Sequence, residues 1–157
     1  MKRWIKAIAL ALTAALLISL CGFSGECADI RQRVVRLHVL ANSDSETDQA
    51  LKLKVRDAVV EAAAGLFDGA EDADQALNLA REKLPELEEV ARQTVKAEGY
   101  DYPVKAKLVN MYFTTRSYED SVTLPAGMYN ALRITIGEAE GKNWWCVVFP
   151  ALCLPAA

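Results

Sequence analysis

The sequence predicts an α+β fold, a two-layer sandwich with a mainly antiparallel sheet in the order β-α-α-β-β-β and helices on one face. Three observations support this prediction. Apolar residues alternate in residues 30–40, recur at helical spacing from 46 to 98, and alternate again from 104 to 149. An apolar run without charges precedes these elements, and we expect it to form an N-terminal signal or anchor helix.

The first strand and the first helix adjoin each other in the sequence. Alternating apolar residues predict a strand over residues 30–40. Ser43 followed three residues later by Glu46 fits a capping box, which predicts that a helix begins there. Apolar side chains then recur at spacings of three and four over residues 46–64, and Gly65 ends the pattern.

A second helical stretch covers residues 72–98 and contains a proline. Pro85 cannot donate to the helical hydrogen-bond ladder, so it either kinks the stretch or starts a new helix. Gly99 is expected to end the stretch. The remaining elements are three strands and a turn over residues 123–127; the strands are expected at residues 104–113, 128–136 and 144–149.

The N-terminal segment has the features of an export signal. Lys2, Arg3 and Lys6 precede the apolar run, small residues follow it, and no charged residue lies between Lys6 and Glu26. We expect residues 1–27 to be a cleaved signal peptide. An uncleaved membrane anchor is the alternative, because the run is at the short end of what spans a bilayer. A lipoprotein signal is a weaker third option. In each case the rest of the chain leaves the cytoplasm.

Length and charge limit the classes of function. The 157 residues allow one ordinary domain, which we place at residues 28–157. The 18 basic and 21 acidic residues give a net charge of −3, and removing residues 1–27, with three basic residues and one acid, leaves −5. Such a domain has no basic stripe for nucleic acid or anionic lipid, so a protein partner is expected.

No catalytic, cofactor-binding or metal-binding set is recognisable in the sequence. Asp44, Glu46 and Asp48 resemble the start of a calcium loop, but the glycine and glutamate that such a loop needs are missing. His38 is the only histidine, and no nucleophile elbow accompanies it. We therefore expect a protein that is not an enzyme. A secreted hydrolase that uses His38 with residues 42–44 stays open as an alternative.

The C-terminal half contains two cysteines and many aromatic residues. Outside the cytoplasm Cys146 and Cys153 are expected to form a disulfide, with two buried free thiols as the alternative. Trp144 and Trp145 are adjacent in a strand, so they point to opposite faces. One of them can lie in the core while the other is at least partly exposed or covered by a partner. The alternative, in which both tryptophans pack within the layers of the domain itself, is about equally well supported by the sequence.

Three sequence blocks resemble one protein family. The first is RLHVLANSDS at residues 36–45 followed by DQALKLKVRD at 48–57; the other two are TLPAG-x-Y-x-ALR at 123–133 and GE-x-x-GKNWWCVVFP-x-LC at 137–153. They occur in the order found in the stage II sporulation protein R family of endospore-forming bacteria, which this chain resembles over nearly its whole length after the signal. Two departures are Thr114, where the family tends to have proline, and Met128, where glutamate is common.

The resemblance implies a signalling role rather than a catalytic one. Proteins of this family are made in the forespore and secreted into the space between the two sporulation membranes. There they trigger a membrane-embedded aspartic protease that processes the precursor of the mother cell's early sigma factor. A structural envelope protein stays open as another alternative. Polar or aromatic residues at strand ends and turns are the expected partner contacts: Arg36, His38, Asn42, Asp44, Arg116, Tyr129, Trp144 and Trp145.

Overall fold

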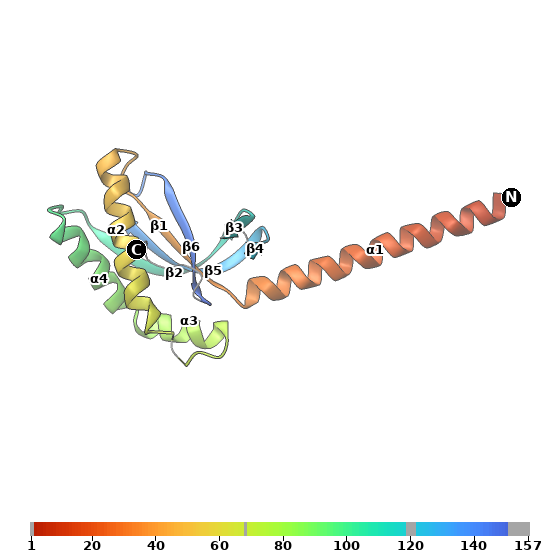
Figure 1. Ribbon diagram of the computed structural model, residues 1–157, viewed down its shortest axis with the longest axis horizontal. Helices are drawn as coiled ribbons and strands as arrows, with labels where there is room; N and C mark the ends of the chain where they lie inside the picture. The colour runs from red at the N-terminus through yellow and green to blue at the C-terminus, as the bar shows by residue number, and fades with distance from the viewer. Residues whose placement is uncertain (1, 68, 119–121, 151–157) are drawn as a thin grey trace.

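A four-stranded mixed sheet lies at the centre of the fold (Figure 1). The computed structural model describes residues 2–67, 69–118 and 122–150. The sheet has the strand order β2-β5-β1-β6, and its strands are β1 (Val35–Leu40), β2 (Val104–Phe113), β5 (Gly127–Ile136) and β6 (Asn143–Phe149). The α+β class is therefore confirmed, and the three predicted C-terminal strands are present.

The prediction of a mainly antiparallel sheet is not confirmed, because the sheet is mixed. β1 lies between β5 and β6, and it runs parallel to β5 and antiparallel to β6. β2 pairs with β5 in the antiparallel direction. The alternation of apolar residues identifies a strand but not its neighbours, so the insertion of β1 between two later strands could not be read from the pattern.

Three helices cover one face of the sheet, as predicted (Figure 1). They are α2 (Glu46–Ala64), α3 (Ala73–Glu82) and α4 (Leu84–Ala97). Their apolar sides pack on the residues of each strand that point to this face, and together they form the larger core. Buried side chains at its centre include Leu37, Val55, Leu87, Leu132 and Ile134.

The predicted helix bounds agree with the structure except at two junctions. α2 begins at Glu46 as predicted, but its N-cap is Ser45, whose hydroxyl accepts from the Asp48 backbone N–H at 3.2 Å, and not Ser43. The second stretch is divided into α3 and α4 at Lys83, and Pro85 occupies the first turn of α4. Of the two outcomes expected for the proline, a new helix is therefore confirmed.

A short hairpin covers part of the other face of the sheet. It consists of β3 (Arg116–Tyr118) and β4 (Val122–Leu124), which pair in the antiparallel direction. The prediction of a turn over residues 123–127 is thus wrong for Thr123 and Leu124, which belong to β4, and for Gly127, which begins β5. Strands of three residues are too short to show a period, so the sequence pattern does not reveal them. All six residues of β1 are buried: Val35, Leu37 and Val39 face the helices, and on the other face the hairpin residue Tyr118 contacts Arg36.

The N-terminal helix α1 (Lys2–Gln32) extends away from the rest of the molecule (Figure 1). It continues past the expected start of the first strand, so the strand prediction is wrong for residues 30–34: residues 30–32 are helical, and β1 begins only at Val35. The end of α1 contacts the start of β5, where the Arg31 Nη1 donates to the Ala126 carbonyl at 3.4 Å. Among the residues that the structure describes, no helix combines the length and apolarity needed to cross a membrane. The signal or anchor role of residues 1–27 stays a prediction.

Candidate functional site

Trp144 and Trp145 lie on opposite faces of β6, as expected, and an arginine covers each ring. Trp144 is on the helix side with 37% of its surface exposed, and the Arg56 guanidinium lies 4.3 Å from its ring centroid. Trp145 is half-buried on the hairpin side, with the Arg116 guanidinium 5.2 Å from its ring centroid. Trp144 is therefore the more exposed of the two tryptophans, and Trp145 is partly exposed.

Arg36 lies at the centre of a buried aromatic cluster beneath the hairpin. Its guanidinium is 4.2 Å from the ring centroid of Phe113 and 5.0 Å from that of Tyr129. The Arg36 Nη2 donates to the hydroxyl of Tyr118 at 2.5 Å. Burial lowers the pKa of Arg36, and the neighbouring Tyr118 opposes this effect. Among the described residues, Nε and Nη1 of Arg36 have no hydrogen-bond partner.

His38 lies next to this cluster and is also buried. Its ring makes edge contacts with Phe113 and Trp145, at centroid distances of 6.2 and 6.0 Å. Burial lowers its pKa, opposed by the side chain of Asn143, although neither ring nitrogen makes a well-formed hydrogen bond to a described residue. The Ser43 hydroxyl donates to Asp48 instead. The hydrolase alternative, which needs His38 to act on a nearby nucleophile, therefore gains no support from this geometry.

The eight expected contact residues fall into two classes. Arg36, His38 and Tyr129 are at most 3% exposed, so a partner can contact them only if the hairpin or Trp145 moves. The other five are exposed or partly exposed: Asn42, Asp44, Arg116, Trp144 and Trp145. Their role in binding stays a prediction.

Asn42 and Asp44 belong to a network where the loop between β5 and β6 crosses the end of β1. Because β1 separates β5 from β6, this loop must span two strand spacings, roughly 10 Å. Asn42 Oδ1 accepts from the Glu138 backbone N–H at 3.0 Å, and Asp44 Oδ1 accepts from the Lys142 backbone N–H at 2.6 Å. Both side chains thus hold the loop in place.

Asp48 connects this loop network to α2. Its Oδ2 accepts from the Ser43 hydroxyl at 2.6 Å and from the Asn42 Nδ2 at 2.8 Å, and the residue is only 4% exposed. The hydrogen bond from Ser43 is the main cause that lowers the pKa of Asp48, while burial opposes it. The carboxylate that resembled part of a calcium loop therefore serves to organise the end of β1.

We expect Asp48→Asn to destabilise the protein by about 1–3 kcal/mol at neutral pH, because a neutral amide oxygen can accept the same two hydrogen bonds only without charge assistance. Since the folded-state pKa of Asp48 is lowered, its stabilisation is present above the ordinary carboxyl pKa. It is lost as the pH falls through the folded-state value. The difference between parent and variant should therefore shrink as the solution is acidified.

Denaturant unfolding of the full chain at several pH values measures this difference. Asp74→Asn is the matched control, because Asp74 is an exposed acid in the first turn of α3. It should change the free energy of unfolding by no more than about 0.5 kcal/mol at any pH. A difference for Asp48→Asn that stays constant from neutral to acid pH would contradict the assignment.

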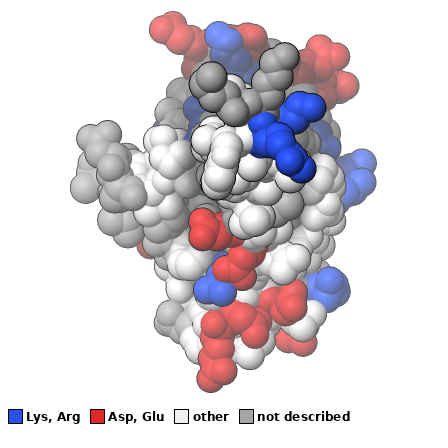
Figure 2. All heavy atoms as spheres, turned by 90° about the vertical axis from the view of Figure 1, so that its right-hand side faces the viewer, with Lys and Arg blue, Asp and Glu red and all other residues white. Residues whose placement is uncertain are grey.

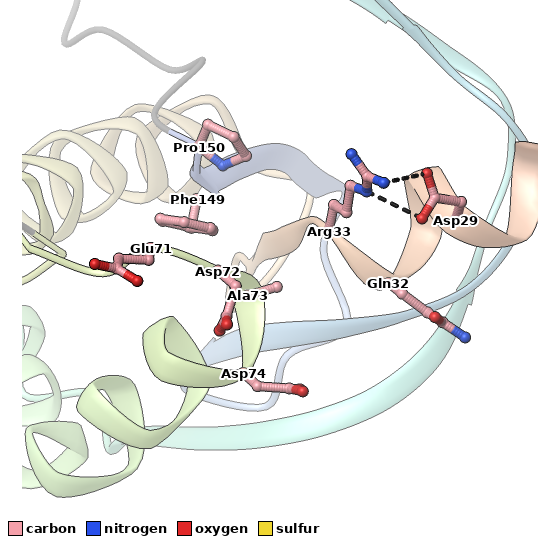
Figure 3. Close-up of a pocket in the computed structure, with 9 residues that line it drawn as sticks. All are labelled: Asp29, Gln32, Arg33, Glu71, Asp72, Ala73, Asp74, Phe149 and Pro150. Atoms are coloured by element: carbon pink, nitrogen blue, oxygen red, sulfur yellow. Dashed lines mark hydrogen bonds and ion pairs between the residues drawn. The ribbon is translucent and has the colours of Figure 1, made fainter.

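A groove of about 540 Å³ lies between the end of α1, the start of α3 and the end of β6 (Figure 3). Its acidic side chains are Asp29, Glu71, Asp72 and Asp74. Figure 2 shows Asp and Glu side chains gathered on the lower part of the face that it presents. Asp29 pairs with Arg33, and Asp72 caps α3 by accepting from the Gln75 backbone N–H at 2.8 Å. Two of these acids thus already have structural partners.

The described residues include possible metal ligands, but only one of the two cysteines that are expected to form a disulfide. Within residues 2–67, 69–118 and 122–150, no three His, Cys, Asp or Glu side chains are arranged to hold a metal ion. Cys146 is buried in β6, whereas Cys153 lies outside the described residues. The disulfide between them stays a prediction.

Sequence reasoning missed four residues that build these clusters. Phe113 and Tyr118 contact Arg36, and no spacing in the sequence links them to it. Gly137 and Gly141 allow the loop to pass close to the end of β1. Two glycines four residues apart beside a predicted strand were the available signal for this close approach.

The fold and these clusters define a class: a small α+β domain with a mixed sheet, carried on an N-terminal helix. A family model described as stage II sporulation protein R matches residues 31–157. The chain is 40% identical over 124 residues to stage II sporulation protein R of Bacillus subtilis (strain 168), which covers 79% of this chain and 55% of that protein. No solved structure matches. The chain belongs to the stage II sporulation protein R family, and this membership supports a role in sporulation.

The match to the curated relative has a limited extent. The chain spans about 55% of the length of that relative. Residues 31–157, which the family model matches, begin near the end of α1 and include every strand of the sheet. The loop network and the aromatic cluster thus both lie within the matched region.

Proposed function

We propose that this chain is an exported sporulation signal that activates a membrane-embedded aspartic protease. The chain would be made in the forespore and would act in the space between the forespore and mother-cell membranes, anchored to the forespore membrane if its N-terminus is not cleaved. The activated protease would then process the precursor of the mother cell's early sigma factor. The observation that carries this proposal is the family match over residues 31–157.

The N-terminal segment supports the export step. Lys2, Arg3 and Lys6 precede a run without charged residues that continues to Glu26, and the segment lies in a helix that extends away from the domain. Such a segment is typical of an export signal. The chain would act by binding: it would favour the active form of the protease by binding that form more tightly than the inactive one.

Co-expression in a bacterium that does not form spores tests the proposal. The full chain, the protease and the sigma-factor precursor are produced together, and cleavage of the precursor is followed by immunoblotting. We expect cleavage to depend on this chain, because the protease alone would remain largely in its inactive form. Equal cleavage with and without the chain would show that the proposed function is wrong.

The export step is tested in the same host with two further variants. Deleting residues 1–27 should abolish cleavage, since the domain would then stay on the wrong side of the membrane. Replacing the same residues with an unrelated cleavable export signal should restore it. Cleavage that persists after the deletion would contradict the proposed topology, and failure of the replacement would show that residues 1–27 do more than direct export.

A further inference from the structure

The charges of this molecule are distributed unevenly between its layers. The chain has 21 acidic residues, yet none of the six strands contains Asp or Glu. Three basic residues of β2 and β5 point to the face opposite the helices: Lys105, Lys107 and Arg133, which we call the basic face. Together with Thr135 they line a hollow of about 180 Å³. The basic face thus lies on a surface whose strand residues offer no acid to neutralise it.

Within the described part of the chain, the charges of the basic face are not paired. None of its three residues takes part in an ion pair with a described acid. The side chain of Arg133 also has a buried Nε without a hydrogen-bond partner. Buried donors are normally satisfied by a partner or by water. The basic face therefore offers donors and positive charge that an anionic ligand can satisfy.

The basic face continues into the aromatic cluster across the sheet. Lys107 is opposite Arg133, Arg133 is opposite His38, and His38 is opposite Trp145 in the strand register. The hairpin covers the other end of this face, around Phe113. Lys105 and Lys107 remain exposed.

We infer that the basic face binds an extended acidic segment of a partner protein. Lys105 and Lys107 are two residues apart in one strand, so their side chains repeat at roughly 7 Å, which is the spacing of alternate residues in an extended chain. Acidic residues at alternate positions of such a segment would therefore meet both lysines and Arg133. The segment would run along β2 on this face of the sheet. It would not pair with the β2 edge, because there Glu88 already accepts from the Ala106 N–H at 2.7 Å.

Position along the sheet favours a protein segment over a lipid surface. α1 meets the sheet at the start of β5, where the Arg31 Nη1 donates to the Ala126 carbonyl and the Arg31 side chain occupies the space that a Cβ at Gly127 would need. Arg133 lies six residues further along β5, roughly 20 Å away. If residues 1–27 remain as a membrane anchor, that anchor would thus leave from the opposite end of the strand. This inference deepens the proposed function, because it gives the chemistry of the surface that the partner would present.

Direct binding tests the inference separately from the proposed function. The full chain in mild detergent is titrated against a labelled peptide of alternating Glu and Thr, followed by fluorescence anisotropy. We expect Lys107→Glu to weaken binding about tenfold, Lys107→Arg to keep it, and replacement of Glu by Gln in the peptide to abolish it. Binding should also weaken as salt rises towards about 0.3 M.

Lys96→Glu is the matched control, because Lys96 is an exposed lysine of α4 in the helical layer. It makes the same change in net charge and should bind the peptide like the parent. Equal weakening by both variants, or none by Lys107→Glu, would overturn the inference. If Lys107→Glu weakens binding only to phosphatidylserine vesicles, the inference is also wrong, and the basic face binds lipid. If Lys107→Glu instead abolishes self-association of the chain in sedimentation, the inference is wrong as well, and the basic face binds a second copy.

The co-expression assay separates the two hypotheses. If the parent chain drives cleavage of the sigma-factor precursor and Lys107→Glu drives it equally well, the inference fails while the proposed function stands. If the parent chain does not drive cleavage, the proposed function fails, and the peptide titration still decides the inference. Reduced cleavage with Lys107→Glu, but not with Lys96→Glu, is the result that supports both.

Discussion

Replacing Gly141 with alanine should destabilise the protein by about 3 kcal/mol, because the new methyl group has no space. A Cβ at this position would overlap the carbonyl oxygen of Ser43 and lie 2.6 Å from its carbonyl carbon. The Gly141 N–H donates to the Ala41 carbonyl at 3.0 Å, so the loop cannot move away without losing this bond. The clash is with backbone atoms, which no change of side-chain rotamer can relieve.

Denaturant unfolding of the parent and the variant measures this effect. Gly65→Ala is the control, since Gly65 ends α2 with a φ of −81° and a Cβ there would meet no atom within 4 Å. That substitution should change the free energy of unfolding by less than about 0.5 kcal/mol. Gly141→Ala as stable as Gly65→Ala would show that the loop does not pass the end of β1 as closely as the structure indicates.

Two substitutions of Arg36 should affect the stability of the protein differently, depending on how much of the buried space the new side chain fills. Arg36→Ala is expected to cost about 3–4 kcal/mol, because it leaves a cavity among Phe113, Tyr118 and Tyr129. Arg36→Met fills most of that space without a buried charge. Since a buried cation loses several kcal/mol of hydration, the methionine variant should be as stable as the parent or more stable.

The pair of variants separates packing from charge. Both are compared with the parent by thermal and denaturant unfolding, and Arg36→Met is then tested in the co-expression assay. A methionine variant that unfolds as easily as the alanine variant would show that the cation–π contacts and the bond to Tyr118 outweigh the cost of burial. A stable methionine variant that no longer supports cleavage would assign Arg36 a role in signalling.

The helices could be predicted closely because their signals are local. The bounds of α2 follow from polar capping residues before Glu46 and from Gly65 after the helix, and Pro85 marked the division between α3 and α4. The capping-box pattern predicts Ser43 as the cap, whereas Ser45 is the cap in the structure. Ser43 and Ser45 both have a hydroxyl that can cap, and only the path of the chain from β1 decides which one reaches the free N–H groups.

The candidate site was predictable only in part. The sequence pointed to Asn42, Asp44 and the two tryptophans, and the structure places all four in specific contacts. The sequence could not show that Arg36 is buried. Arg36 alternates with apolar neighbours, and the pattern alone does not say whether anything covers the second face of β1.

Local signals in the sequence determined the α+β class, the helix positions, the N-terminal apolar segment and the family blocks. Each depends on residues that are close together in the chain, where spacing and capping act directly. Only the tertiary structure decided that β1 lies between β5 and β6, that a hairpin covers Arg36, and that Lys107 and Arg133 share one face. Those facts depend on which distant segments pack together, and packing energy is a property of the whole fold rather than of any one segment.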